Sequence, residues 1–306
     1  MRKKNLIFFI FLLSLLLAII LSPTKFIQAG LNGVSAWAFN VLPAVLPFMI
    51  ISSLLISTNI VEKICFPLSK PFVKIYNTSP YSLYVFFISI LSGYPVGSKM
   101  IADLYEQNKI SQTSAYRMSS FCSNSGPMFI VGSVGVGMLF SATAGYIMLL
   151  SHIISALLNG VLYRNIKSPN DKSVTLSLPS TKQSFGDIIE RSCRSILNVG
   201  AIIMFFFIVI EFVSILIAFL PENIQSIVFG IIEITKGAKS ISSCYEIKMA
   251  TILSSAVITF GGISTALQSI SLLNRVKMPL SLFLLQKFSQ SIFAGIVSFA
   301  LCSVLL

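Results

Sequence analysis

Charged side chains inside apolar stretches are the first candidates for chemistry in this sequence. Glu211 follows ten apolar or aromatic residues, and Ser214 is the only polar residue between it and Leu220. A carboxylate in the middle of a membrane segment is costly and marks a functional site by default. We expect Glu211 either to be neutral and hydrogen-bonded within the bundle or to couple protons, and its position leaves both interpretations open.

A second group of charges follows the string SGYPVG at residues 92–97. Lys99 precedes Asp103 by four residues, so the two can form a local ion pair on a helix. Lys99 lies only two residues past the glycine break, which makes it the candidate of this group to face a cavity. We expect Glu106 and Lys109 to lie on a solvated helix.

The string GIIEITKGAKS carries a third group. Glu233 and Thr235, a carboxylate and a hydroxyl near a glycine, could bind a cation or a substrate hydroxyl, so Glu233 joins Glu211 as a candidate for ion coupling. Alternatively, Gly237 ends a helix, and the lysines on either side of it favour the negative end of that helix. Spacing alone does not separate these interpretations.

Three polar or glycine-rich breaks interrupt the apolar segments that would position such groups: SGYPVG (92–97), SNSGP (123–127) and FGGIS (260–264). Irregular backbone at membrane depth survives only where protein or a water-filled cavity satisfies its N–H and C=O groups. Interrupted segments in corresponding positions of two halves are the best sequence pointer to a transporter's binding site. The candidate binding residues are Gly93, Tyr94, Pro95, Gly97, Lys99, Asn124, Ser125, Gly126, Pro127, Glu233, Thr235, Gly261, Gly262, Ser264 and Gln268.

A simpler interpretation accompanies each break, because Gly and Pro are common in transmembrane helices and Pro127 could be an ordinary kink. The composition nevertheless places the whole chain in a membrane. Of its 306 residues, 55% are hydrophobic and only 10% are charged, whereas soluble domains carry about 25% charged residues. Residues 6–21 form an apolar stretch without a convincing cleavage site, and we expect a retained first span there.

Basic residues outnumber acidic ones by 22 to 10, and they cluster at residues 2–4 and 164–194. Lys and Arg gather in cytoplasmic loops of membrane proteins. We therefore expect the N-terminus and the central linker to face the cytoplasm, and we expect no nucleic-acid partner. This makes the lipid bilayer the main surrounding of the chain.

Few residues could support catalysis or hold a metal ion. The five cysteines are scattered without a C-x-x-C pair, and His152 is the only histidine. We expect neither a metal site nor a disulfide framework, and a hydrogen-bonded packing role for His152. The chain contains no G-x-x-x-x-G-K-[ST], H-E-x-x-H or G-x-S-x-G motif. We therefore predict no enzymatic activity and no cofactor.

The order of segments predicts an all-α polytopic membrane protein of two related halves with broken or re-entrant helices, and about eight to ten membrane-embedded segments. Gly93 and Gly261 stand 168 residues apart, a spacing that also matches Leu104 with Leu272. The predicted parts are an N-terminal span (1–25), a first membrane half (26–163), a cytoplasmic linker (164–184) and a second membrane half (185–306).

Several of these strings carry a family resemblance. SGYPVGSKMIADLYEQNKIS and FCSNSGPMFIVGSVGVGML closely resemble segments of the YlbJ-type sporulation integral membrane proteins. EITKG and FGGIS look like the E-x-T-x-G and S-F-G-G motifs of that family, although Thr259 stands where the serine would be. The resemblance runs from about Trp37 to the C-terminus. The chain is short for this family, and its central linker looks abbreviated, which puts regulation or partner contacts in doubt.

The resemblance implies a nucleoside recognition (Gate) domain in two copies, similar in architecture to concentrative nucleoside transporters, and admits a homo-oligomer. It also implies transport of dipicolinic acid from the mother cell across the outer forespore membrane. A planar dianion would favour helix N-termini, a lysine and hydroxyls, as offered by Lys99, Asn124, Ser125 and Ser264. A nucleoside would favour Glu233, Asn124 and Gln268. A nucleoside or nucleobase carrier and a non-transporting scaffold for spore formation stay open as alternatives.

Overall fold

The computed structural model describes residues 3–57, 60–169 and 184–306, and throughout these ranges the chain is helical without strands. Four helical segments are long and apolar enough to cross a membrane, and a fifth arises if the bent pair of N-terminal helices is one span. The predicted all-α polytopic architecture is therefore confirmed, whereas the number of eight to ten embedded segments stays a prediction. Residues 170–183 of the predicted linker lie outside the described residues.

The first part of the chain contains α1 (Lys3–Leu21), α2 (Pro23–Ala36), the π-helix η1 (Trp37–Val41), α3 (Leu42–Ser57), α4 (Ile60–Leu68), α5 (Lys70–Tyr76), α6 (Tyr81–Ser92), α7 (Val96–Glu106), α8 (Gln112–Ser119), the π-helix η2 (Met128–Val136) and α9 (Ala142–Leu162). The second part contains α10 (Phe185–Leu216), α11 (Glu222–Ile232), α12 (Ile234–Cys244), α13 (Ile247–Phe260), α14 (Gly262–Leu273), the 3-10 helix η3 (Asn274–Val276) and α15 (Leu280–Leu305).

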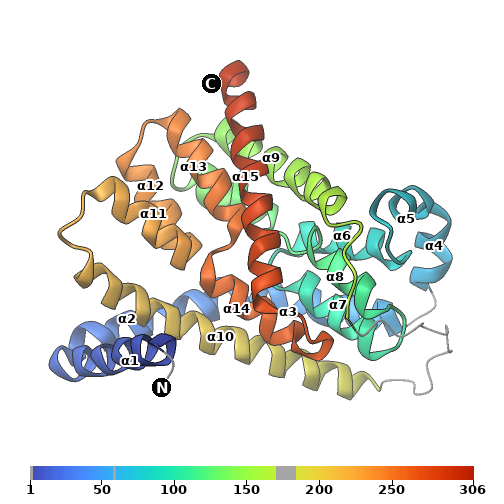
Figure 1. Ribbon diagram of the computed structural model, residues 1–306, viewed down its shortest axis with the longest axis horizontal. Helices are drawn as coiled ribbons and strands as arrows, with labels where there is room; N and C mark the ends of the chain where they lie inside the picture. The colour runs from blue at the N-terminus through green and yellow to red at the C-terminus, as the bar shows by residue number, and fades with distance from the viewer. Residues whose placement is uncertain (1–2, 58–59, 170–183) are drawn as a thin grey trace.

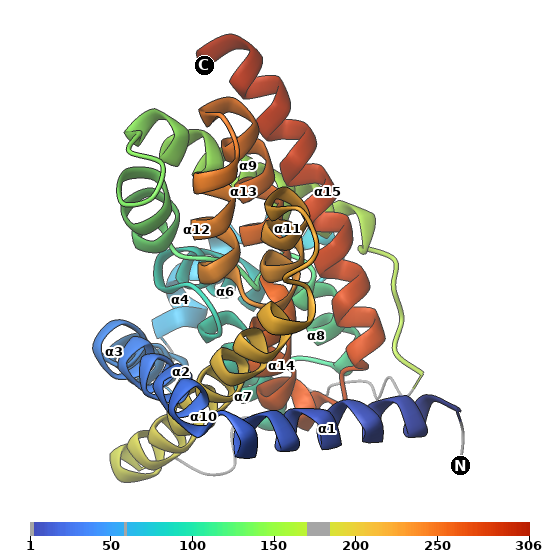
Figure 2. The same ribbon diagram turned by 90° about the vertical axis from the view of Figure 1, so that its left-hand side faces the viewer.

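Helices from both parts pack side by side. In Figure 1, α10 runs along the lower edge with α1 and α2 beside one end, and α15 rises from it to the C-terminus. The Trp37 indole donates to the Ile196 carbonyl (3.1 Å), and Lys25 pairs with Glu211 (3.1 Å). From Lys25 to Trp37 the residue number rises, whereas that of the contacted residue in α10 falls from 211 to 196. Helices α2 and α10 are therefore antiparallel. The N-terminal pair, α1 and α2, bends by 106°, so α1 turns away from α2 in Figure 2.

Two helix pairs form hairpins. At the open end of each hairpin, a residue one to three positions after the second helix contacts the first helix. In α6–α7, the Lys109 ammonium lies 5.4 Å from the centre of the Tyr81 ring. In α11–α12, the Tyr245 hydroxyl donates to the Asn223 carbonyl (3.1 Å). Their tips fall at Gly93–Pro95 and at Glu233. We call these pairs the first and the second hairpin.

Two other helix pairs form broken helices. The chain leaves α8 after Ser119 and resumes helix in η2 at Met128, so the predicted break at SNSGP is confirmed. Likewise α13 ends at Gly261, which has a positive φ of 85°, and α14 follows at once. Residues 247–276 together qualify as one membrane span. We call these the first and the second broken helix.

Corresponding residues of the two halves are not separated by 168 positions in the structure. That spacing aligned Gly93 with Gly261, but Gly93 lies at a hairpin tip and Gly261 within a broken helix. The structural counterpart of Gly93 is Glu233, the tip of the second hairpin, 140 residues later. The glycines share a local role, which is ending a helix, and this local likeness produced the misleading match.

Lys109 is buried, so the prediction of a solvated position for it was wrong. Asn108 adopts a left-handed conformation with φ of 55° and turns the chain back after α7. The Lys109 ammonium then donates to the Ile56 carbonyl (2.7 Å) inside the protein.

The interpretation of Gly237 as a helix end was also wrong. Gly237 lies inside α12, where its backbone packs directly on Gly230 of α11.

Candidate functional site

The tip of the first hairpin meets the first broken helix backbone to backbone. A Cβ added to Gly93 would lie 2.8 Å from the Gly126 nitrogen, and one added to Gly97 would overlap the Cys122 carbonyl oxygen. Both neighbours belong to the segment between α8 and η2. Only glycine allows this approach, so the two breaks that sequence analysis selected separately, 92–97 and 123–127, form one junction.

The tip of the second hairpin meets the second broken helix. A Cβ added to Gly262 would lie 3.0 Å from the Ile232 carbonyl oxygen, next to the tip residue Glu233. The Glu233 carboxylate accepts from the N–H groups of Thr235 (3.0 Å) and Lys236 (2.8 Å). It thereby satisfies free donors at the positive end of α12. Glu233 is therefore the N-cap of α12, and its predicted part in ion coupling stays a prediction.

Tyr94 and His152 connect the two junctions. The Tyr94 hydroxyl donates to the Thr259 carbonyl (3.2 Å), just before the second break. The Ser125 N–H donates to His152 Nε2 (3.0 Å), and His152 Nδ1 lies 2.8 Å from the Thr259 hydroxyl. Since Nε2 accepts a hydrogen bond, the ring proton belongs on Nδ1, and the imidazole is neutral in this arrangement. The predicted hydrogen-bonded role of His152 is confirmed, at the centre of the site.

Asn124 lies beside the same junction. Its amide nitrogen donates to the Ser89 hydroxyl (2.9 Å) of α6 and to the Phe121 carbonyl (2.8 Å). Its amide oxygen lies 3.5 Å from the Gln290 amide nitrogen of α15. The Asn124 side chain is 1% exposed. It thus supplies the hydrogen-bonding groups that lipid cannot, which explains a polar SNSGP string between apolar segments.

Lys287 of α15 brings a positive charge to this network. Its ammonium donates to the Ser123 carbonyl (2.9 Å) and to the Gln290 amide oxygen (2.7 Å), and it lies 5.0 Å from the centre of the Tyr94 ring. The side chain is 1% exposed, and within the described part of the chain no carboxylate pairs with it. A buried cation usually requires a counter-charge.

Lys287 was not among the residues predicted from sequence, although its sequence context carries a signal. The string LFLLQKFSQSIF places one lysine inside a long apolar helix, the same pattern that drew attention to Glu211. Gln290 follows one turn later on the same face, where it contacts the lysine. The Ser123 hydroxyl, also buried, has no hydrogen-bond partner among the described residues. A bound polar molecule would explain such an unsatisfied group.

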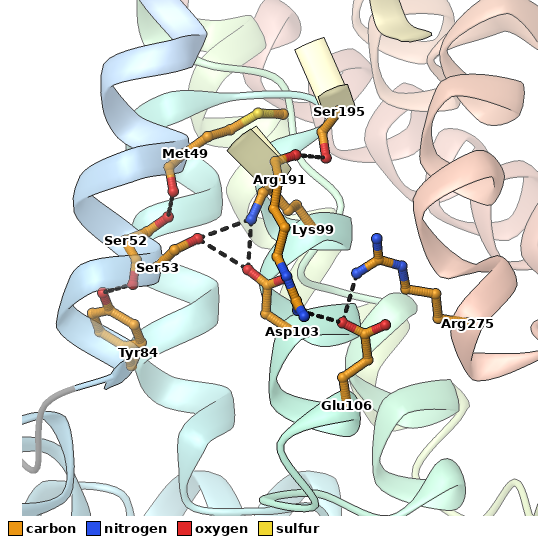
Figure 3. Close-up of polar contacts among 10 residues, drawn as sticks. All are labelled: Met49, Ser52, Ser53, Tyr84, Lys99, Asp103, Glu106, Arg191, Ser195 and Arg275. Carbon is orange, nitrogen blue, oxygen red and sulfur yellow. Dashed lines mark hydrogen bonds and ion pairs between the residues drawn. The ribbon is translucent and has the colours of Figure 1, made fainter. Parts of the chain in front are cut away.

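Lys99 lies in a separate cluster, shown in Figure 3. Its ammonium contacts the Asp103 carboxylate (2.6 Å) and donates to the Ser53 hydroxyl of α3 (2.9 Å), which in turn donates to Asp103 (3.0 Å). The predicted local ion pair is confirmed. The charge of Lys99 is already neutralised by Asp103. The lysine that lies at the breaks without a carboxylate partner among the described residues is therefore Lys287 and not Lys99.

Glu106 lies at the end of the first hairpin and accepts from two arginines of the second half, Arg191 (3.2 Å) and Arg275 (2.6 Å). It is partly exposed, and the three side chains face one another in Figure 3. Glu211, the acid in the middle of an apolar segment, pairs with Lys25, and the Glu211 and Lys25 side chains are 26% and 54% exposed. This ion pair explains how the chain tolerates Glu211 without requiring a role for it in ion coupling.

The remaining candidates surround the second junction or form the turns. Gln268 donates to the Ser264 hydroxyl (3.3 Å), and both side chains are buried on α14. Pro95 and Pro127 directly precede the first residues of α7 and η2. Thr235 lines a cavity beside the second hairpin.

Comparison with known proteins adds one informative similarity. No family model matches the chain, and no solved structure does. The chain is 27% identical over 329 aligned residues to the "Sporulation integral membrane protein YlbJ" of Bacillus subtilis (strain 168). The alignment covers 94% of this chain and 80% of that protein. This supports a YlbJ-type assignment.

The resemblance found in the sequence motifs is thereby confirmed. The name of the relative describes an integral membrane protein of sporulation, and the apolar helices of this chain agree with an integral membrane protein. The two strings that carried the resemblance, SGYPVG and SNSGP, are the hairpin tip and the helix break that touch each other at Gly93 and Gly126. The two strings that most closely resemble the YlbJ-type proteins therefore build the central junction of this chain.

Proposed function

We propose that this YlbJ-type protein transports a small anionic metabolite through the region where its two hairpin tips and two broken helices meet. The observation that carries the proposal is Lys287, a buried lysine among hydrogen-bonding groups with no carboxylate partner within the described residues. An anionic substrate would supply the missing counter-charge.

The surroundings of Lys287 suit a carboxylate. Helix breaks expose backbone donors and acceptors that can exchange partners with a substrate. The Ser123 hydroxyl lacks a partner, and the side chains of Asn124 and Gln290 are held only loosely together at 3.5 Å. A planar aromatic anion would also fit beside Tyr94, whose ring already lies near the lysine. By family resemblance, the substrate that we propose is dipicolinic acid.

The proposed location is the outer forespore membrane, with substrate moving from the mother cell. The basic groups Arg191 and Arg275 lie at the end of the molecule where the central linker joins α10. Basic residues favour the cytoplasmic side, which supports a cytoplasmic linker. In this proposal the protein is a carrier without enzymatic activity or cofactor.

The test is the dipicolinate content of spores from a strain that lacks the gene, with dipicolinate synthesis in the mother cell verified. The strain is complemented with the wild type, Lys287→Gln or Lys248→Gln, the last being an exposed lysine of α13. We expect wild type and Lys248→Gln to restore the content. Lys287→Gln should lower it by roughly 10- to 100-fold, because one charge-assisted hydrogen bond to substrate is worth about 1.5–3 kcal/mol.

Protein levels measured in the same cells separate lost transport from lost protein. Normal dipicolinate in the deletion strain would exclude this substrate and direct the search to nucleosides. Full activity of Lys287→Gln at normal protein level would exclude the proposed site.

A further inference from the structure

The second helices of the two hairpins share a short pattern. Gly97-Ser98-Lys99 in α7 and Gly237-Ala238-Lys239 in α12 stand 140 residues apart, and each glycine lies four residues past its hairpin tip. Each glycine also makes a close backbone contact, with Cys122 and with Gly230. Lys99 and Lys239 therefore occupy equivalent positions in the two hairpins.

The two lysines have opposite surroundings. Lys99 is 3% exposed and is neutralised by Asp103, four residues further on the same helix. The corresponding residue after Lys239 is Ser243, so α12 has no carboxylate at that place. Lys239 is exposed, and across the described ranges it pairs with no acidic residue. The second hairpin thus has the lysine without its counter-charge.

Lys239 lines a cavity of about 550 Å³ between the second hairpin and helices α2 and α10. Further hydrogen-bonding groups in the lining are Lys236, Thr235, Ser240, Ser243 and Gln225. The Lys236 ammonium lies 5.6 Å from the centre of the Phe229 ring, which forms part of the wall. Glu222 also lines the cavity but pairs with neither lysine, so two cations face one anion there.

We propose that this cavity is a second binding site, for a small carboxylate anion, whose carboxylate lies beside Lys239 as that of Asp103 lies beside Lys99. Lys236 supplies a second cation, and the hydroxyl of Ser240 supplies a hydrogen bond. The volume lies within the range of small-molecule pockets. Thr235 belongs both to the cavity lining and to the first turn of α12 after the tip Glu233.

The cavity therefore adjoins the tip of the second hairpin and forms an access site for the central junction. That part of the inference rests on the proposed function, whereas anion binding in the cavity does not.

Cys244 lines the cavity and reports on its occupancy. The protein is purified with Cys65→Ser and Cys193→Ser, since the other two cysteines, Cys122 and Cys302, are buried. It is reconstituted in nanodiscs of zwitterionic lipid, and the rate of maleimide reaction with Cys244 is measured. We expect glutarate or dipicolinate to slow the reaction at least three-fold, relative to chloride at equal ionic strength.

Three variants locate the effect. Lys239→Gln should remove the protection, whereas Lys248→Gln, an exposed lysine outside the cavity lining, should keep it. Lys287→Gln should also keep it, because the central site is separate. If Lys287→Gln abolishes dipicolinate uptake while no dicarboxylate protects Cys244, the cavity inference fails and the proposed function stands. The reverse combination leaves the cavity as an anion site and removes the proposed function.

A lipid phosphate is the competing source of negative charge. Nanodiscs that contain phosphatidylglycerol form the second arm of the measurement. Slowing of the Cys244 reaction by phosphatidylglycerol, with no effect of glutarate or dipicolinate in either lipid, would overturn the proposal and assign the cavity to a lipid headgroup. Equal protection in the wild type and Lys239→Gln would overturn it as well.

Discussion

The first hairpin satisfies its charges internally, and the second does not. In α7, Lys99 pairs with Asp103, and Glu106 joins two arginines of the other half. In α12, both lysines lie at a cavity without a carboxylate partner among the described residues. A charge that is paired inside the protein holds helices in place, whereas an unpaired one is available to a ligand. Two elements of the same shape therefore differ in whether their lysines have a carboxylate partner among the described residues.

This difference favours an anchoring role for the helices of the first hairpin, and the proposed cavity site would give α12 of the second hairpin contact with an anion. The first hairpin is fixed to α3 through Ser53 and to the second half through Glu106. The second hairpin is bordered by a cavity along α2 and α10. If one hairpin moves during transport, we expect it to be the second, because the first is held by ion pairs and the second borders a cavity.

The largest effect is expected from removing the internal counter-charge of the first hairpin. Asp103→Asn leaves Lys99 buried without a carboxylate, which should cost about 3–5 kcal/mol in the free energy of unfolding. Ser243→Ala, the matching position of the second hairpin, should change it by less than about 0.5 kcal/mol. Denaturant unfolding in detergent micelles measures both.

The double variant Lys99→Met with Asp103→Leu is the control, because it removes both charges and should recover most of the loss. If Asp103→Asn proves as stable as the wild type, the first hairpin is not held by this pair, and the contrast between the hairpins disappears.

A smaller effect is expected at the packed glycines. Gly97→Ala and Gly237→Ala each force a methyl group against backbone, against Cys122 and Gly230 respectively. Overpacking of this kind costs about 1–3 kcal/mol. Gly132→Ala is the matched control, since nothing lies within 4 Å of an added Cβ there. Thermal unfolding should rank both packed positions well below Gly132→Ala, and equal stability of all three would show that the hairpins do not depend on these contacts.

The smallest effect on stability is expected at Glu106, the partly exposed residue through which the first hairpin contacts the second half of the chain. Glu106→Gln should cost about 1 kcal/mol or less, because ion pairs such as those with Arg191 and Arg275 are weakened by water and salt. The difference in melting temperature from the wild type should shrink between roughly 0.05 and 0.5 M NaCl, as screening predicts. A large loss that does not depend on salt would mean that Glu106 acts through packing rather than charge.

Local features of this protein were predictable from sequence. The apolar runs predicted an all-α membrane protein, and the glycine and proline strings located the breaks at 92–97, 123–127 and 260–264. The Lys99–Asp103 pair was predictable because its members are four residues apart on one helix. The interpretation of Gly237 as a helix end was wrong, because Gly237 lies inside α12, whose N-cap is Glu233.

The site itself depends on contacts between distant parts of the chain. Lys287 contacts Ser123 across 164 residues, and His152 reaches Thr259 across 107. Sequence periodicity describes only neighbours along a helix, so it could not show that Lys99 is neutralised, that Lys109 turns inward or that Lys287 is unpaired at the breaks. The sequence alone located the three glycine and proline breaks and the apolar helices around them. The tertiary structure decided which breaks meet and which charges remain unpaired, because burial and pairing of a charge are set by whatever the fold packs against it.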